Sequence, residues 1–471
     1  MKAVTLRRCF LTELKENFFW GNSTSSIQTE GAWDTDGKGK SVYDIQSSTD
    51  NASDWKNAID EYHRYEEDFD LMQNQGINFY RFQISWSRVN PTGDGKFSER
   101  GMAFYSRLID ALLIRGIQPM ICLYHFDMPL ALAEKYNGFL SRHVIDAFIR
   151  YGTEVIKRFS NKVKYWITFN EQNLYHTSDV FRISGYLKGP RTNDELYQIS
   201  HHIMLAHAGI ANYIHEQTNC LIGGMLAYAE IYPASPKPED IQIARKTDEF
   251  INRNLLDAFV YGHYSNEVLT YLRNHDINMD WQVVDKKILS KLHSDYIAFS
   301  YYRSETISAE QVPQDIIPNY YVDYGIKKNP YLKTSEWGWD IDPLGFQDVL
   351  VKIYNEYGIP VFPIENGIGV HEKFAGSEIQ DDYRIEYHRS HINAMKNAIK
   401  FNGVDVLGYL VWGLIDIPSS SGNMDKRYGM VYVNRDNHDL KDMRRVTKKS
   451  YWWFRKVIKT NGEDLTDVLE N

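Results

Sequence analysis

The chain has few cysteines for its length and no excess of basic residues. Its 471 residues include three cysteines, Cys9, Cys122 and Cys220, an odd number at wide spacing. This pattern argues against a disulfide framework or a cysteine zinc site and indicates a reducing compartment. The formal net charge is -9, with acidic and basic residues interspersed, so no domain-wide positive field exists to bind nucleic acid.

Long apolar runs are also missing. No stretch approaches about 18 consecutive apolar residues, the length that spans a bilayer as a helix. Residues 1–21 include basic side chains, but they lack an apolar core followed by a small-residue cleavage site, so they do not read as a secretory leader. We therefore expect a cytoplasmic protein without a membrane partner. A hydrophobic fraction of 43% with 24% charged residues is typical of a globular chain.

What the sequence does contain is a regular alternation of strand-like and helix-like segments. Short apolar, β-branched or aromatic runs bounded by turn residues predict strands, and longer segments with apolar residues three and four apart predict helices. Eight strands are predicted, at residues 18–25, 78–85, 118–126, 164–171, 221–228, 295–302, 360–366 and 404–412. Predicted helices include 58–75, 101–115, 142–159, 195–217, 240–261, 345–357, 383–401 and 449–459.

This alternation predicts the fold class. The run 119–124 (PMICLY) is apolar throughout, as in parallel strands that are buried on both faces. Eight such strands alternating with helices predict an α/β fold, a closed (β/α)8 TIM barrel. A doubly wound open sheet is the rival, but no glycine-rich phosphate loop follows the first strand. Because no linker or repeat interrupts the pattern, we expect one domain over residues 1–471.

Polar residues capable of chemistry occur where the predicted strands end. Arg81 lies at the end of the second strand, His125 at the third, Asn170 and Glu171 at the fourth, and Glu365 at the seventh. Reactive groups in such barrels lie at the carboxyl ends of the strands. We therefore expect Glu171 and Glu365 to project from opposite walls of one mouth.

Two facing glutamates are what cleavage of a glycosidic bond requires. One donates a proton to the leaving oxygen, and the other stabilises or attacks the oxocarbenium-like carbon. A carboxylate of low pKa needs a neighbouring cation, and Arg81 is the only arginine that the sequence places near the mouth. The other glutamate must stay protonated, through apolar surroundings or through the charge of the first carboxylate.

Four segments carry a resemblance to a known family. The segments TFNE, IENG, FFWGNSTSSIQTEG and FYRFQISWSR resemble those of family 1 glycoside hydrolases, and the likeness runs from about residue 17 to the last predicted helix. The resemblance implies hydrolysis with retention of configuration, with Glu171 as acid/base and Glu365 as nucleophile. It also implies that Arg81 and Tyr302 hold the nucleophile ionised and aligned.

The same resemblance implies residues that bind the sugar. Gln28, His125 and Asn170 look like the hydrogen-bonding residues for sugar hydroxyls, and Trp412 looks like the platform under the sugar ring. Trp339, in the long loop after the sixth predicted strand, resembles the aromatic residue that meets the aglycone. Gln172 and Phe139 depart from the common family pattern, which bears on the fit of the aglycone and not on the chemistry.

The segment 419–429 (SSSGNMDKRYG) bears on the substrate. Family members acting on neutral sugars usually have Glu then Trp where this chain has Ser419 then Ser420. A carboxylate there would repel a 6-phosphate, whereas a hydroxyl donates to it. Ser419, Lys426 and Tyr428 match the phosphate-binding set of 6-phospho-β-glycosidases, and Phe126, where neutral-sugar enzymes usually have Trp, points the same way. The small Ser420 favours glucosides, since galactoside-specific members tend to have Trp there.

The sequence thus predicts an enzyme that hydrolyses 6-phospho-β-D-glucosides, such as cellobiose 6-phosphate or phosphorylated aryl β-glucosides, by double displacement. Three alternatives stay open: a 6-phospho-β-galactosidase, a neutral-sugar β-glucosidase, and a non-catalytic sugar-phosphate binding protein. No cofactor and no metal are predicted, because neither a dinucleotide loop nor a clustered set of metal ligands occurs. The predicted partner is a small molecule, and the oligomeric state is left open.

Overall fold

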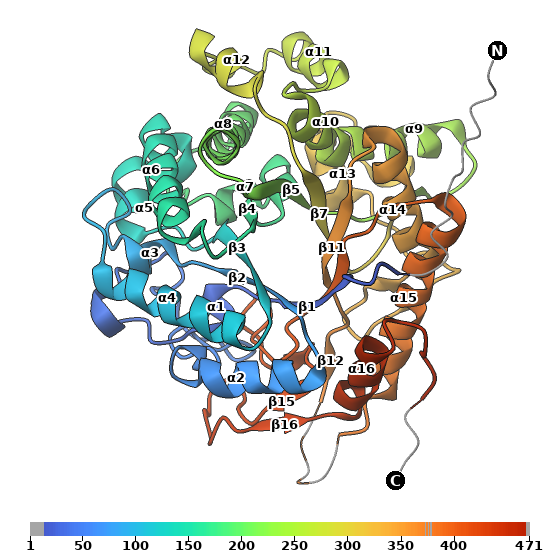
Figure 1. Ribbon diagram of the computed structural model, residues 1–471. Coiled ribbons are helices and arrows are strands. Elements are labelled where there is room, and N and C mark those ends of the chain that lie inside the picture. Colours follow the sequence, from blue (N-terminus) through green and yellow to red (C-terminus); the bar gives the residue numbers. More distant parts are fainter. Residues whose placement is uncertain (1–13, 373, 375, 377–378, 468–471) are drawn as a thin grey trace, which may run out of the picture.

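The computed structural model describes residues 14–372, 374, 376 and 379–467, and within them eight parallel strands close into a barrel. Neighbouring strands pair in the order β1, β13, β11, β7, β5, β4, β3, β2 and back to β1. They occupy the centre of Figure 1. Their bounds are Phe19–Ser23 (β1), Phe79–Gln83 (β2), Gln118–Tyr124 (β3), Tyr165–Phe169 (β4), Leu221–Ala227 (β5), Tyr296–Tyr301 (β7), Val361–Asn366 (β11) and Gly408–Trp412 (β13).

The predicted (β/α)8 barrel is therefore confirmed, and each of the eight predicted strands contains one observed strand. The bounds differ most in β13, which begins at Gly408 instead of residue 404. Val406 forms only an isolated bridge with Val361, so the preceding residues approach the barrel without joining its ladder. Apolar composition alone does not distinguish such an approach from a strand.

Helices surround the barrel (Figure 1). The principal ones are Glu61–Gln75 (α2), Glu99–Ile114 (α4), Arg142–Phe159 (α6), Asn193–Gln217 (α8), Pro238–Asp248 (α9), Asn254–Tyr261 (α10), Asn266–Asn274 (α11), Val283–Leu289 (α12), Pro343–Tyr357 (α14), Asp382–Asn402 (α15) and Lys449–Lys459 (α16). In α6 the buried residues, among them Val144, Phe148, Tyr151 and Val155, recur every three or four positions, so one face of the helix packs on the barrel.

The predicted helix at 240–261 is interrupted in the structure. A π-helical turn, Glu249–Arg253, lies between α9 and α10. The predicted helix at 58–75 begins only at Glu61, because Ala58 and Asp60 have left-handed backbone angles, with φ of 44° and 58°. Both differences are local changes in backbone hydrogen bonding that leave the apolar periodicity intact.

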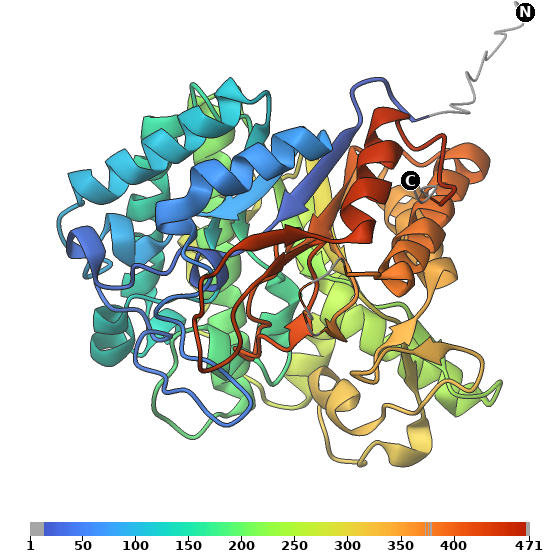
Figure 2. The same ribbon diagram turned by 90° about the horizontal axis from the view of Figure 1, so that it is seen from below.

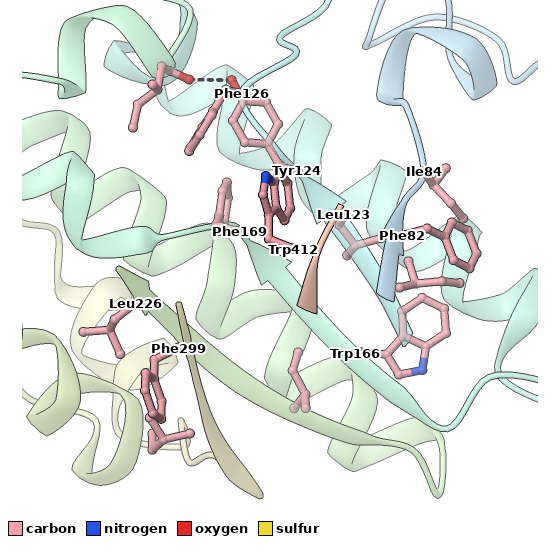
Figure 3. Packing of buried hydrophobic residues seen from close by; sticks show 14 of the residues in the cluster. Phe82, Ile84, Leu123, Tyr124, Phe126, Trp166, Phe169, Leu226, Phe299 and Trp412 are labelled. Atoms are coloured by element: carbon pink, nitrogen blue, oxygen red, sulfur yellow. Dashed lines mark hydrogen bonds between the residues drawn. The ribbon is translucent and has the colours of Figure 1, made fainter. Parts of the chain in front are cut away.

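Apolar side chains fill the interior of the barrel. Ten buried residues from the barrel strands form one interior cluster: Phe79, Met120, Cys122, Ile167, Met225, Tyr296, Ala298, Phe362, Ile364 and Leu410. Outside the barrel, strand residues pack against the helices, as Figure 3 shows for Leu226 and Phe299, which are register partners on β5 and β7. A filled interior leaves the mouth at the carboxyl ends as the place for a site.

The long loops that follow the strands lie on the lower side of the molecule in Figure 2. Short antiparallel pairs stiffen them: Val370–His371 (β12) with Lys426–Arg427 (β14), and Val431–Val433 (β15) with Arg445–Thr447 (β16). Cys122 and Cys220 are free and buried, and Cys9 lies outside the described residues. In the described part of the chain, no helix has the length and apolar content needed to cross a membrane.

Candidate active site

The residues singled out from the sequence lie at the carboxyl ends of different strands or in the loops that follow. Arg81 is in β2, Glu365 is in β11, and Trp412 is the last residue of β13. The others are Gln28 in the short helix Ser26–Thr29 (α1), His125 after β3, Asn170 and Glu171 after β4, Tyr302 after β7, Trp339 before Asp340–Ile341 (β10), Ser419 and Ser420 after β13, and Lys426 and Tyr428 in and after β14.

Glu365 is held by two donors. Its Oε1 accepts from Nη1 of Arg81 over 2.8 Å, and its Oε2 accepts from the Tyr302 hydroxyl over 2.9 Å. The side chains of Arg81 and Glu365 are 0% and 3% exposed, so this ion pair is shielded from water. Charge-assisted bonds of this kind fix the orientation of a carboxylate. The contacts inferred for these three residues are present.

Arg81 also links Glu365 to the wall that carries Glu171. Its Nη2 donates to Oδ1 of Asn170 over 2.5 Å, and its Nη1 donates to the Thr24 carbonyl over 3.3 Å. One guanidinium therefore ties together the ends of β1, β2, β4 and β11. Its planar arrangement of donors suits such bridging.

Glu171 contacts a residue that the sequence did not indicate. Its Oε1 accepts from the Ser300 hydroxyl over 2.6 Å. Ser300 lies on β7 and is the register partner of Glu365 on β11, so the Glu171 carboxylate reaches across the mouth to the strand beside the other glutamate. Glu171 itself has left-handed backbone angles, φ 42° and ψ 57°. Such angles are uncommon for a residue with a side chain and cluster at functional sites.

Burial raises the pKa of both glutamates. For Glu365 burial is the largest cause, Arg81 and Tyr302 oppose it, and the charge of Glu171 adds to it. For Glu171 burial again dominates and the Ser300 hydroxyl lowers the pKa in part. The prediction of a low pKa for Glu365 is therefore wrong, because desolvation outweighs the guanidinium. For Glu171, burial shifts the pKa in the direction that the prediction requires.

Residues expected to bind the sugar lie around this pair. The rings of His125 and Trp412 stack with centroids 5.7 Å apart. Burial lowers the pKa of His125, so its imidazole is neutral, and its Nδ1 has no partner among the described residues. Gln28 accepts from Ser25 and donates to the carbonyl of Pro418 over 2.7 Å. Phe126, labelled in Figure 3, is buried, and its ring lies 6.5 Å from that of Tyr175 and 4.9 Å from that of His125.

Only some of the substrate-binding residues predicted in the loop 419–429 lie close to the site. The buried Ser419 hydroxyl lies 3.0 Å from that of Ser421 and accepts from the backbone N–H of Asn423 over 3.2 Å. Tyr428 is buried, and its ring lies 6.2 Å from that of Tyr302. Ser420 is exposed and has no hydrogen bond to any described residue. The structure therefore does not bring Ser420 into the group.

Lys426 connects this loop to Trp339. Its Nζ lies 3.5 Å from the centroid of the Trp339 ring, 5.1 Å from that of Trp337 and 5.5 Å from that of Tyr428. Burial, aided by the charge of Arg303, lowers the pKa of Lys426 to about 8. No described aspartate or glutamate forms an ion pair with it.

A cavity of about 670 Å³ adjoins the site on the side of β5 and β7. Its walls include Ser300 and Tyr302, which bind the two glutamates, together with Asn173, Arg303 and Trp339. Neither glutamate lines it, and neither do the residues of the loop 419–429. The cavity therefore lies beside the carboxylates, on the side where Trp339 was expected to meet the aglycone.

Sequence reasoning missed three residues here. Arg303 follows Tyr302 at the end of β7, so Arg81 is not the only arginine at the mouth, and its position at a strand end was the available signal. The sequence does not indicate a functional role for Ser300 or Trp337, because a serine in a strand and a tryptophan in a loop are common in proteins of any function. Among the described residues, no group of three or more His, Cys, Asp or Glu side chains is arranged to hold a metal ion.

Comparison with known proteins gives consistent matches over the whole described barrel. The profile of glycosyl hydrolase family 1 matches residues 11–463. Aryl-phospho-beta-D-glucosidase BglC from Bacillus subtilis is 39% identical, over 96% of this chain and 98% of that protein. A phospho-cellobiase from Klebsiella oxytoca is 37% identical, with 96% and 98% covered. A family 1 β-glucosidase from Thermotoga maritima superimposes with a TM-score of 0.85 at 30% identity, with 96% and 99% covered.

Proposed function

Because this chain belongs to glycosyl hydrolase family 1, we propose that it hydrolyses 6-phospho-β-D-glucosides with retention of configuration. The observation that carries the phosphate assignment is the buried ammonium of Lys426, which has no ion pair with a described carboxylate. A desolvated cation without an acidic partner is costly unless an anion completes the site. The names of two relatives, aryl-phospho-beta-D-glucosidase and phospho-cellobiase, support the same substrate class.

In the first step of the proposed reaction, Glu365 attacks the anomeric carbon. The bond from that carbon to the aglycone oxygen breaks, and Glu171 gives its proton to the departing oxygen. Arg81 and Tyr302 hold the attacking carboxylate in one orientation and favour its ionised form. The Ser300 hydroxyl holds Glu171 in place, and burial raises the pKa of Glu171, which favours its protonated form.

In the second step water attacks the glycosyl-Glu365 ester. Glu171, now ionised, takes a proton from this water, and Glu365 leaves as a carboxylate, so the β-configuration is restored. The two carboxyls act as a coupled pair that shares one proton at the start of the cycle. The mechanism requires that proton on Glu171, and the donors Arg81 and Tyr302 act in this direction by lowering the pKa of Glu365 against the effect of burial.

The remaining residues of the site are proposed to bind the sugar and its 6-phosphate. Gln28, His125 and Asn170 are proposed to bind sugar hydroxyls, and the neutral imidazole of His125 has an unused Nδ1 for this purpose. Trp412, stacked on His125, forms the platform under the ring. Ser419, Lys426 and Tyr428 are proposed to bind the 6-phosphate. Since phosphorylated sugars do not cross membranes unaided, the proposed substrate implies work in the cytoplasm.

A comparison of four nitrophenyl substrates tests the proposal: β-glucoside and β-galactoside, each with and without a 6-phosphate. We expect the highest kcat/KM for the 6-phospho-β-glucoside, and the first product should be the β-anomer of glucose 6-phosphate by NMR. Faster cleavage of the neutral glucoside would remove the phosphate assignment. Faster cleavage of the phosphorylated galactoside would overturn the glucoside preference inferred from Ser420. Release of the α-anomer would contradict retention.

A further inference from the structure

The Lys426 side chain ends in a box of aromatic rings. Its Nζ lies over the face of Trp339 at 3.5 Å from the centroid, with Trp337 at 5.1 Å and Tyr428 at 5.5 Å. All three distances are within the range of cation–π attraction, which is strongest for tryptophan. Lys426 is 8% exposed, so this attraction acts in a largely desolvated place.

Ring faces hold this ammonium in a way that a carboxylate would not. A carboxylate would neutralise the charge and occupy its N–H donors, whereas an aromatic face attracts the cation and leaves the donors free. Among the described residues, the ammonium of Lys426 has no hydrogen-bond acceptor and no ion-pair partner. The box therefore keeps a charged group with three available donors inside the protein.

Trp337 is positioned by its ring faces and not by its N–H. Its Nε1 is buried and has no partner among the described residues, and its ring lies 4.9 Å from that of His371. His371 is the register partner of Lys426 in the β12–β14 pair, so Trp337 packs across that short ladder. Five other indoles do donate their Nε1: those of Trp20, Trp55, Trp86, Trp166 and Trp453. A buried donor without a partner carries a free-energy cost, which the ring contacts must offset.

Trp337 and Trp339 both lie near the Lys426 ammonium, but only one of them also lines the cavity beside the glutamates. Trp339 contacts Lys426 and also lines the cavity beside the glutamates. Trp337 contacts Lys426 but does not line that cavity. A change at Trp339 therefore alters both the cavity wall and the surroundings of the ammonium, whereas a change at Trp337 alters the surroundings of the ammonium and the packing on His371 but not that cavity.

We propose that Trp337 is a specificity-determining positioning residue, which together with Trp339 orients the Lys426 ammonium for the 6-phosphate of the substrate. The inference rests on the proposed function, since it assumes that Lys426 binds that phosphate. A lysine side chain has high rotamer entropy, so a fixed ammonium binds an anion with less ordering than a mobile one. Trp337 acts through Lys426 and touches neither the sugar nor the reacting atoms.

The variant Trp337→Leu tests this inference, with Trp337→Phe as the conservative variant and Trp452→Leu as a matched control. Trp452 is a half-exposed tryptophan on α16 without a contact to Lys426. For each protein, kcat/KM is measured with nitrophenyl β-glucoside and with its 6-phosphate. Because the aglycone is the same, effects on the aglycone cancel in the ratio of the two values.

We expect Trp337→Leu to lower this ratio about tenfold, about 1.4 kcal/mol, through a higher KM for the phosphorylated substrate. Cleavage of the neutral glucoside should stay within about twofold, because the cation–π contact is not used there. Trp337→Phe should recover most of the ratio, and Trp452→Leu should leave it unchanged.

The outcomes separate the inference from the function on which it rests. If the wild-type protein prefers the phosphorylated substrate but Trp337→Leu keeps the full ratio, the inference is wrong and the proposed function stands. If both substrates lose activity equally, Trp337 has only a structural role, and the inference is again wrong. If the wild type itself prefers the neutral glucoside, the proposed function fails first.

Discussion

The Ser300 hydroxyl donates a hydrogen bond to Oε1 of Glu171 over 2.6 Å. Ser300 is also the register partner of Glu365, so the strand beside one carboxylate orients the other. The bond lowers the pKa of Glu171, against the rise that burial causes. A single strand position thereby sets both the orientation and the acidity of the group proposed as acid/base.

Removing this hydroxyl gives the first prediction. Ser300→Ala should raise the pKa of Glu171 and move the alkaline limb of the kcat/KM profile to higher pH, because the bond stabilises the ionised form. The rate should fall about tenfold, more for poor leaving groups, since a less well oriented acid delivers its proton less effectively. Ser300→Thr keeps a hydroxyl and should restore the profile. An unshifted profile in Ser300→Ala would contradict the role.

The two glutamates should respond differently to the leaving group. Glu365→Ala should lose about 10³-fold or more in kcat with any aglycone, because the covalent route is gone. Glu171→Ala should lose much less with a dinitrophenyl aglycone than with an alkyl one, since a good leaving group needs no proton. Steady-state kinetics over a series of aglycones checks this. Equal sensitivity of both variants to the aglycone would contradict the assigned roles.

The fold could be predicted from the sequence because its signals are local. The run 119–124 is apolar throughout, and it forms a strand buried on both faces. The π-helical turn Glu249–Arg253 could not be predicted, because the apolar pattern of 240–261 continues through it. Strand and helix types follow from periodicity, whereas one inserted backbone residue does not alter that signal.

The site could be predicted where its reactive residues lie near the carboxyl end of a predicted strand. Arg81 lies within β2 and Glu365 lies near the end of β11, and their ion pair was expected. Ser300 is 129 positions from Glu171, and Trp337 lies on a different loop from Lys426, so both contacts depend on how distant segments close over the mouth. The prediction of a low pKa for Glu365 was wrong because desolvation outweighs the charge of Arg81, and the sequence does not show how deeply a residue is buried.

The preference for a phosphorylated substrate should depend on pH. Lys426, with a pKa of about 8, is protonated below that pH and loses its charge above it. A phosphate monoester becomes a dianion only above about pH 6. The ratio of kcat/KM for phosphorylated and neutral nitrophenyl glucosides should therefore be greatest between these two values. In Lys426→Arg the alkaline fall should disappear, because guanidinium stays charged. A ratio that is flat from pH 6 to 9 in the wild type would contradict this role for Lys426.

Ser419 gives a specificity prediction with a neighbouring control. Ser419→Glu should lower kcat/KM for the phosphorylated glucoside about 100-fold, because a buried carboxylate repels the dianion, and should spare the neutral glucoside. Ser420→Glu adds the same charge at the adjacent exposed position and should have a much smaller effect. Comparable losses in both variants would mean that Ser419 does not face the phosphate.

The backbone of the loop 419–429 is held by a buried arginine, which leads to the last prediction. Nη1 of Arg384 donates to the carbonyls of Tyr428 over 2.6 Å and Ile368 over 2.8 Å, and its Nε pairs with Asp381. Arg384→Gln should reduce the free energy of unfolding by about 3–5 kcal/mol, the usual cost of breaking a buried ion pair.

The variant should also raise KM for the phosphorylated substrate more than for the neutral one, because Tyr428 loses its anchor while the glutamates keep theirs. On the same helix, α15, Arg389 pairs with the exposed Glu386 and Asp467, so Arg389→Gln is a suitable control. Its cost should be about 1 kcal/mol, because exposed pairs contribute little. Denaturant unfolding and kinetics with both substrates measure the two effects separately. A destabilised Arg384→Gln with unchanged substrate preference would mean that Arg384 supports the fold but does not position the loop for phosphate.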